Sequence, residues 1–384
     1  MFDNSGSKSG SGTSGLYVHV PFCRTKCRYC GFYSEPIAQH DAGAVVGAMI
    51  AEMERYELGD EVKTIYIGGG SPSCLAPEHL LRIVNRAAQR CPAAGEFTIE
   101  VNPGQVNMDL LRQLSKAGVN RLSIGAQSFI QRELDFLGRG HTAECVGRVV
   151  QQARAAGFEN VSLDLIFAVP GSCLDSWKYN LHEAHALAVD HVSAYSLAYE
   201  GGTALERDLA AGVIEPIDED TDRAMYELTI DELERAGIAQ YEISNFARGG
   251  FECRHNLNYW ANDGYVGIGP GAASYQKGVR STNFADINKY AQAVAGGAST
   301  VESSETLVSR QHACETAVLN LRRRSGIDLA EFKSRTGFDP IQLFAEPIRA
   351  YQQAGLIESN GGRIFLTRSA LAIADSILCD FALI

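Results

Sequence analysis

Three cysteines near the amino terminus have the spacing of an iron–sulfur ligand set. Cys23, Cys27 and Cys30 form a C-x₃-C-x₂-C run directly after an apolar segment, and no fourth cysteine lies close by. A [4Fe–4S] cluster normally takes one thiolate per iron, so three cysteines leave one iron open to a ligand that is not protein. The run therefore predicts a [4Fe–4S] cluster with one exchangeable position.

Two other uses of these thiols compete with the cluster. A structural zinc ion takes four nitrogen or sulfur ligands, usually from two separated pairs. Cys74 and His19 could complete such a set, but no second pair follows the run. Disulfides are disfavoured because the chain has no secretory signal, which also favours a reducing cytoplasmic location. Zinc or free thiols stay open as the weaker alternatives.

The elements that must hold this run alternate regularly between apolar strands and amphipathic helices. The expected strands cover 16–22, 62–68, 96–102, 121–127, 161–168 and 191–199. The expected helices cover 41–58, 77–90, 107–117, 142–156, 174–188 and 219–236. Such alternation predicts an α/β fold with a parallel sheet and right-handed crossovers. Six units are too few for a closed eight-stranded barrel, so we expect an open (β/α)₆ partial TIM barrel.

Polar and glycine residues lie at the carboxyl ends of these strands. Gly68, Gly69 and Gly70 follow the second strand, and Glu100 and Gln127 lie near the ends of the third and fourth. Asp164 lies within the fifth strand, and Ala198 near the end of the sixth. Active sites of α/β barrels are built at this edge of the sheet. We therefore expect one site there, together with the cysteine run.

Four regions follow from the pattern. Residues 1–15 form a Gly/Ser-rich leader that we expect to be disordered, and 16–240 form the barrel. Residues 241–300 break the alternation and read as a connecting segment. Residues 301–384 predict a small winged-helix-like α+β domain, with a hairpin turn at Asn360–Gly362.

Composition excludes several partners. The formal net charge is −12, so nonspecific binding to nucleic acid is disfavoured, because it requires clustered positive charge. No apolar run approaches the roughly 20 residues of a membrane span.

Gly267–Ala272 fits the dinucleotide pattern G-x-G-x-x-G/A, but no amphipathic helix opens after it and Pro270 interrupts it. We interpret it as a structural loop.

The first strand and the cysteine run, LYVHVPFCRTKCRYCGFYS, resemble the start of radical S-adenosylmethionine (SAM) proteins. GGGSP, IEVNPG, RLSIGAQSF, LGRGH and SLDLIFAVPG are similar to SAM-contacting segments of the coproporphyrinogen III oxidase-like branch of that superfamily. The resemblance implies SAM at the open iron. The positions that it assigns to SAM are Tyr17, Tyr29, Gly69, Gly70, Ser71, Glu100, Gln127, Arg139, Asp164 and Ala198.

A later segment narrows the resemblance. Residues 255–260 read HNLNYW and look like the HNxxYW motif of HemW-type heme chaperones. Phe32 stands where the related dehydrogenases carry a further cysteine. The resemblance implies heme contact at His255, Asn256, Tyr259 and Trp260, with Cys253 as an alternative thiolate ligand. The structural alternative is that His255 and Asn256 cap a loop and Trp260 packs in the core.

Function follows from the resemblance rather than from composition. It implies a chaperone that binds cluster, SAM and heme and delivers heme to apo-hemoproteins, respiratory ones among them. This expectation leans away from catalysis and is compatible with a homodimer. Two enzymatic alternatives stay open. They are an oxygen-independent coproporphyrinogen III dehydrogenase, and another radical SAM enzyme of tetrapyrroles such as one that opens the heme ring.

Overall fold

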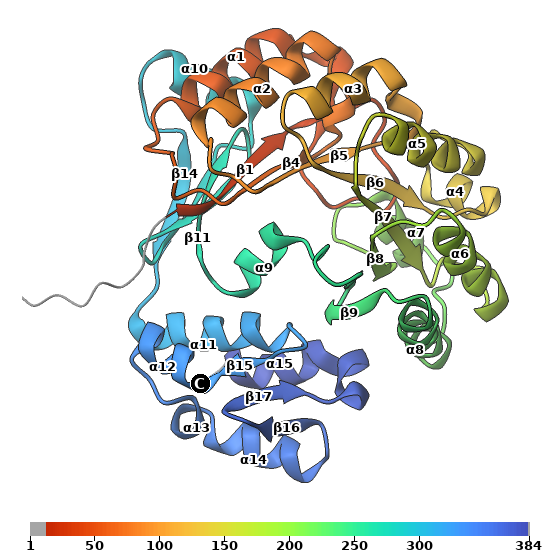
Figure 1. Cartoon of the computed structure of the whole chain (residues 1–384), viewed down its shortest axis with the longest axis vertical. Coiled ribbons are helices and arrows are strands. Elements are labelled where there is room, and N and C mark those ends of the chain that lie inside the picture. Colours follow the sequence, from red (N-terminus) through yellow and green to blue (C-terminus); the bar gives the residue numbers. More distant parts are fainter. Residues whose placement is uncertain (1–12, 383–384) are drawn as a thin grey trace, which may run out of the picture.

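Six parallel strands form the centre of a curved sheet that is covered by helices on its convex face (Figure 1). The computed structural model describes residues 13–382. The strands are β1 (Thr13–Val20), β4 (Thr64–Gly69), β5 (Glu96–Val101), β6 (Arg121–Gln127), β7 (Asn160–Phe167) and β8 (His191–Ser196). They are hydrogen-bonded in this order, so the predicted open α/β partial barrel is confirmed.

The covering helices bury one apolar stripe each. They are α1 (Ala42–Met53), α2 (Pro77–Arg90), α3 (Met108–Lys116), α4 (Gln131–Leu137), α5 (Ala143–Ala155), α6 (Leu174–Ala186) and α8 (Glu219–Arg235). In α2 the buried residues Leu80, Ile83, Val84 and Ala87 repeat with helical spacing. Side chains of Asp41 and Asn107 accept from the first-turn amides of α1 and α3, which fixes where these helices begin.

Residues 241–300 are not a separate connecting segment, because all of the strands in this range extend the same sheet. β11 (Gly264–Ile268) pairs in parallel with β1, and β12 (Ala273–Gln276), β13 (Val279–Asn283) and β14 (Val301–Thr306) continue antiparallel. On the opposite edge, β10 (Asn245–Ala247) and β9 (Ala239–Glu242) follow β8. The βα alternation stops here because neighbouring strands are joined as antiparallel hairpins, which need no crossover helix.

One buried carboxylate ties this extension to the barrel. Glu52 of α1 is fully buried and accepts from the Gly269 amide at 2.8 Å and from Tyr290 of α10 (Ile287–Ala295) at 2.6 Å. Asn283 and Thr300 donate to the same carboxylate. The glycine-rich pattern at Gly267–Ala272 is thus the turn between two strands and not a dinucleotide loop.

The amino-terminal boundary differs from the prediction. Thr13–Gly15 belong to β1 and not to a disordered leader, because Thr13 and Gly15 pair with one neighbouring strand and Gly15 also pairs with the other. Residues 1–12 of the predicted leader lie outside the described residues.

The C-terminal domain begins at α11 (Ser309–Leu321), later than predicted, because Val301–Thr306 belong to the large sheet. It contains α12 (Leu329–Thr336), α13 (Pro340–Leu343), α14 (Ala345–Gln353) and α15 (Ala374–Ala382), with a three-stranded sheet of β15 (Ile327–Asp328), β17 (Arg363–Leu366) and β16 (Ile357–Asn360). Gly361 and Gly362 both have positive φ, as the tight β16–β17 turn requires. No helix within residues 13–382 is long and apolar enough to cross a membrane.

Candidate functional site

The three cysteines lie on the loop that follows β1. Cys23 ends the short strand β2 (Phe22–Cys23), which pairs with β3 (Glu35–Pro36) and so closes the loop at its base. All three thiols are partly exposed, and burial raises the pKa of Cys23 and of Cys30. The guanidinium of Arg139 donates to Sγ of Cys27 over 3.4 Å. Three thiols from one loop, with a cation beside them, suit a thiolate-held cluster.

A single zinc ion fits this arrangement less well. Within residues 13–382, no three His, Cys, Asp or Glu side chains converge closely enough to hold one metal ion. Ligands of one zinc must all lie about 2.0–2.3 Å from the same point. Ligands of a cluster bind different irons and need not converge on one point, so this finding does not count against a cluster.

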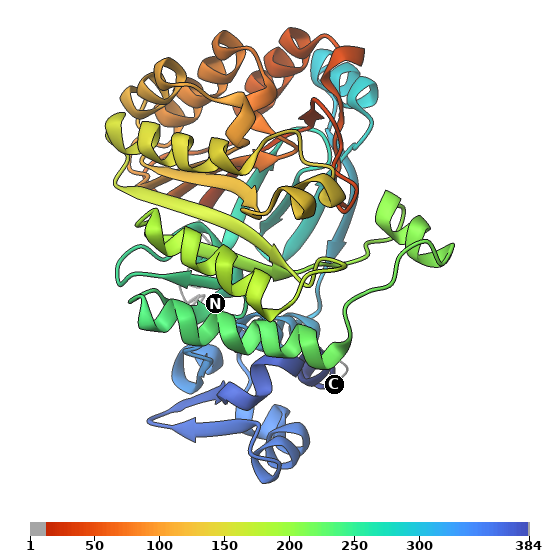
Figure 2. The ribbon, with the colours of Figure 1, turned by 90° about the vertical axis from the view of Figure 1, so that its right-hand side faces the viewer.

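A helix that the sequence reasoning missed holds the cluster loop. The backbone oxygen of Arg28, next to Cys27, accepts from the Leu205 amide of α7 (Ala204–Ala210) at 3.0 Å. Its guanidinium donates to Asp208 of α7 at 2.5 Å and to the Phe136 oxygen at 2.9 Å. Figure 2 shows α7 standing apart from the other barrel helices. The only sequence signal was an arginine inside the cysteine run.

The glycine run at the end of β4 allows close packing on the cluster loop and on a carboxylate. A Cβ at Gly70 would lie 2.4 Å from the Phe22 oxygen, and one at Gly68 would lie 2.8 Å from the Glu100 carboxylate. Gly69 has φ +105°, which only glycine adopts freely. The Ser71 amide donates to the Phe22 oxygen at 2.7 Å, and its hydroxyl donates to Gln105.

Glu100 lies on β5 beside this glycine run. Its carboxylate accepts a 2.7 Å hydrogen bond from the hydroxyl of Tyr66 and interacts with the Gly69 amide. Burial raises the pKa of Glu100 to about 7, and the Tyr66 bond opposes this rise in part. Such a carboxylate can exchange its proton near neutral pH and pair with an ammonium group of a ligand.

Other predicted SAM positions gather at the same end of the sheet. Asp164 is raised in pKa by burial and accepts from Ser123 at 3.2 Å. Gln127 has φ +68° at a register shift between β6 and β7, so its backbone departs from regular strand geometry. Asp164 and Tyr17 both interact electrostatically with Glu100.

Two predicted positions belong to the cluster side of the site, and a third lies beyond the end of β8. Tyr29 on the cluster loop is hydrogen-bonded to Arg139, whose second nitrogen donates to the Gly125 oxygen at 2.7 Å. Burial raises the pKa of Tyr29. Ala198, beyond the end of β8, is exposed and has no polar side-chain atom with which to hold a ligand.

The segment 255–260 forms a helix at the opposite end of the barrel. The helix α9 (Arg254–Trp260) begins against Glu96, whose carboxylate accepts from the amides of Arg254 at 2.8 Å and His255 at 2.9 Å. The hydroxyl of Thr64 forms a 2.8 Å hydrogen bond with Nδ1 of His255. Glu96 and Thr64 are the first residues of β5 and β4, so α9 lies across the amino ends of these strands (Figure 1).

Both ring nitrogens of His255 have protein partners. Nε2 bonds to the hydroxyl of Tyr259 at 2.9 Å, while Nδ1 bonds to Thr64. The side chain is 1% exposed, and burial lowers its pKa to about 3. Its ring stacks on Tyr66 at a centroid distance of 5.2 Å. In this arrangement, neither nitrogen of His255 has a lone pair directed at a ligand.

Trp260, at the end of α9, contacts the C-terminal domain. The guanidinium of Arg322 lies 4.8 Å from its ring centroid, and Asn320 of α11 donates to its backbone oxygen at 3.0 Å. Its indole nitrogen is buried without a hydrogen-bond partner. Asn256 is partly exposed on the same helix. The segment thus joins the barrel to the C-terminal domain.

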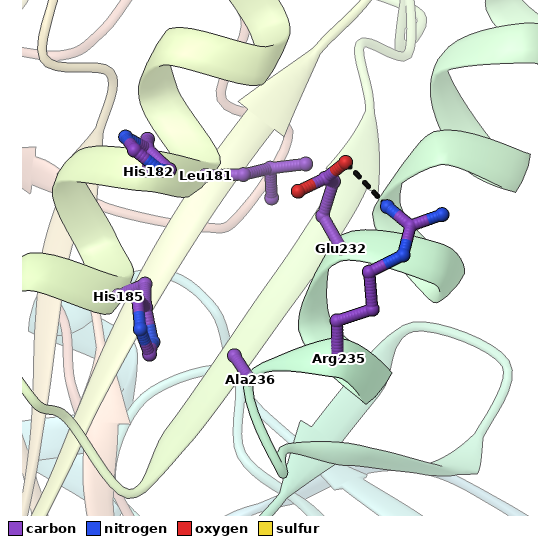
Figure 3. Close-up of a pocket in the computed structure, with 6 residues that line it drawn as sticks. All are labelled: Leu181, His182, His185, Glu232, Arg235 and Ala236. Atoms are coloured by element: carbon purple, nitrogen blue, oxygen red, sulfur yellow. Dashed lines mark hydrogen bonds and ion pairs between the residues drawn. The ribbon is translucent and has the colours of Figure 1, made fainter.

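A pocket of about 190 Å³ on the outside of the barrel lies apart from these residues (Figure 3). It is lined by His182 and His185 of α6 and by Glu232 and Arg235 of α8, and Glu232 is already paired with Arg235. None of the sequence-predicted site residues lines it.

Comparison with known proteins shows the family to which this chain belongs. The Radical SAM superfamily domain matches residues 17–182, and the HemN C-terminal domain matches residues 308–373. The heme chaperone HemW of Bacillus subtilis is 33% identical over 373 residues, which cover 95% of this chain and 98% of that protein. The chain belongs to the HemW family. HemW of Mycobacterium tuberculosis is 35% identical over 372 residues, covering 95% and 93% of the two chains.

The fold extends beyond the HemW family. The solved structure of the coproporphyrinogen III oxidase HemN from Escherichia coli superposes with a TM-score of 0.84 at 21% identity, covering 97% of this chain and 91% of that one. At this identity the likeness shows the fold alone. Membership in the radical SAM superfamily implies a [4Fe–4S] cluster and SAM, for which the loop and strand ends described above supply thiols, carboxylates and a guanidinium.

Proposed function

We propose that this chain is a heme chaperone, which binds heme and delivers it to apo-hemoproteins, including respiratory ones. The observation that carries the proposal is the match to HemW over nearly the whole length of both chains. The proposal assigns the [4Fe–4S] cluster to Cys23, Cys27 and Cys30. When bound, the cluster offers one iron to SAM and supplies one-electron redox chemistry.

Different residues of the chain suit different chemical groups of SAM. The carboxylate of Glu100 suits the ammonium group, and the glycine run offers backbone oxygens to the same group. Arg139 suits the SAM carboxylate by a charge-assisted pair, and Asp164 suits the ribose hydroxyls. Support comes from the electrostatic proximity of Glu100 and Asp164 and from the contact of Arg139 with the cluster loop.

Heme contact at His255, Asn256, Tyr259 and Trp260 stays a prediction. Iron ligation by His255 requires that at least one of its hydrogen bonds, to Thr64 or to Tyr259, break first. Cys253 is fully buried and burial raises its pKa to about 12, so it is a thiol and not a thiolate at neutral pH. Heme binding is therefore best tested on the whole protein before a ligand is assigned.

The test is anaerobic reconstitution with iron and sulfide, followed by two measurements on the same sample. We expect heme to bind with a shifted Soret band, and 5′-deoxyadenosine not to accumulate when SAM and a reductant are added. Failure to bind heme would overturn the proposal.

The fold of HemN favours one second candidate, the oxidative decarboxylation of coproporphyrinogen III. That activity would release protoporphyrinogen IX and consume SAM. Formation of this product by the reconstituted protein would replace the chaperone proposal with an enzymatic one.

A further inference from the structure

Tyr66 contacts both the segment 255–260 and the proposed SAM site. Tyr66 lies in the middle of β4, between Thr64 at the amino end and Gly68–Gly70 at the carboxyl end. Its ring stacks on His255, at an interplanar angle of 26°, and its hydroxyl donates to Glu100 at 2.7 Å. Thr64 and Gly68 are four residues apart, which is about 13 Å along a strand.

The position of His255, at one end of this connection, is fixed by its contacts. His255 is held by Thr64 through Nδ1 and by Tyr259 through Nε2, and Glu96 holds the helix start. Every one of these partners is a neighbour in the folded barrel and not in sequence, except Tyr259. The face of the imidazole that meets Tyr66 therefore has a defined position relative to β4 and β5.

The Glu100 carboxylate, at the other end of this connection, is equally constrained. The Glu100 carboxylate lies so close to Gly68 that a Cβ there would come within 2.8 Å of it. With the glycine run on one side and the Tyr66 hydroxyl on another, the carboxylate has little room for a second rotamer. A change in the Tyr66 ring would thus move the group that we assign to the ammonium of SAM.

We infer that His255 and Tyr66 are positioning residues for SAM binding, and that in this chain the segment 255–260 sets the Glu100 carboxylate from the opposite end of the barrel. This inference rests on the proposed SAM site. It gives His255 a role other than heme ligation, one that uses both of its ring nitrogens as the structure has them.

The experiment measures SAM affinity of the reconstituted protein by anaerobic equilibrium dialysis between pH 5.5 and 8.5. Tyr66→Phe keeps the ring and removes the hydroxyl, and we expect about tenfold weaker binding, as for loss of one hydrogen bond to a charged group. His255→Gln is expected to weaken binding about threefold, as for residues coupled through one contact. Tyr265→Phe is the matched control, because the Tyr265 ring contacts Tyr259, and within residues 13–382 no hydrogen bond or ring contact joins Tyr265 to Tyr66 or Glu100.

The pH profile separates positioning from general damage. SAM binding by the wild type should rise through pH 7 as Glu100 ionises, and Tyr66→Phe should move this rise upward, because the Tyr66 bond favours the ionised form. The other groups that interact electrostatically with Glu100, none of them altered by the substitution, are Asp164, Arg121, Tyr17 and Tyr259. Heme uptake, followed at the Soret band, should not change in Tyr66→Phe.

Several results would overturn the inference. One is a SAM affinity and pH profile of Tyr66→Phe equal to those of Tyr265→Phe; another is a His255→Gln protein that loses heme and binds SAM normally. If Tyr66→Phe does not fold, Thr64→Val removes the hydroxyl partner of His255 instead and should also weaken SAM binding. A wild type that binds no SAM at all would instead refute the proposed site itself.

Discussion

The guanidinium of Arg139 donates to Sγ of Cys27 over 3.4 Å and, with its other nitrogen, to the Gly125 oxygen at 2.7 Å. A residue that follows α4 thereby links the cluster loop to strand β6. A nearby cation stabilises a thiolate relative to a thiol, and thiolates are the form that binds iron.

Replacing Arg139 should therefore impair cluster assembly. We expect Arg139→Gln to take up less iron at neutral pH and to recover part of the loss at higher pH, where the thiols ionise without help. Iron and sulfide content after reconstitution, at pH 7 and pH 9, measures this. Arg132→Gln is the control, because Arg132 donates to the Gly171 oxygen and, within residues 13–382, makes no hydrogen bond to the cluster loop. Equal iron content in both variants would show that Arg139 does not support the thiolates.

The contact of α7 with the cluster loop predicts a kinetic effect. Arg28 and Asp208 are each about one-third exposed, at 34%, so their ion pair is worth about 1 kcal/mol or less to global stability. We expect Asp208→Asn to leave the unfolding midpoint almost unchanged and to shorten the lifetime of the cluster under a chelator. Asp231→Asn removes an exposed pair with Arg368 that lies far from the cysteines in sequence and serves as the control. Equal cluster lifetimes in Asp208→Asn and Asp231→Asn would show that α7 does not stabilise the cluster loop.

Glu100 should make the ligand-free protein less stable as pH rises. Its folded pKa is about 7, above its ordinary value of 4.5, so between these values the folded state keeps a proton that the unfolded state releases. The contribution of Glu100 to the free energy of unfolding is thus fully present below pH 4.5 and is lost as the pH rises to 7. This loss is on the order of 3 kcal/mol. Glu100→Gln should flatten this part of the curve. Urea unfolding at pH 5.5 and 8 measures it, and an unchanged slope would contradict the assignment.

His255 predicts the opposite dependence. Its folded pKa of about 3 lies below the ordinary 6.5, so protons bind more tightly to the unfolded state and stability falls as pH drops below 6.5. His255→Gln should be less stable at pH 7.5 because packing is lost, but should lose about 2 kcal/mol less between pH 7.5 and 5. Asn288→Gln, at the exposed start of α10, is a control. A slope equal to that of the wild type would show that His255 is not buried in neutral form.

The sequence foretold the parallel half of the sheet because its strands are continuous apolar runs separated by amphipathic helices. Glu100 and Asp164 could be expected at one edge for the same reason, since strand ends in such sheets meet. These predictions depend on local patterns, which a single sequence displays.

What could not be foretold depends on contacts between distant residues. The α9 helix has only seven residues, and its first amides are capped by Glu96, which precedes them by more than 150 positions. Likewise, β11 pairs with β1 across some 250 positions, so its place beside the first strand leaves no local trace. The link from His255 through Tyr66 to Glu100 exists only once these contacts have formed.

Heme transfer tests the central claim most directly. The reconstituted protein is loaded with heme, freed of excess, and mixed with an apo-hemoprotein whose holo spectrum is distinct. We predict that heme reaches the acceptor faster than it dissociates spontaneously from this chain. We also predict that the triple variant Cys23→Ala, Cys27→Ala and Cys30→Ala transfers heme more slowly than the wild type. Heme that stays on this chain, or that reaches the acceptor only at the rate of its spontaneous release, would contradict the account.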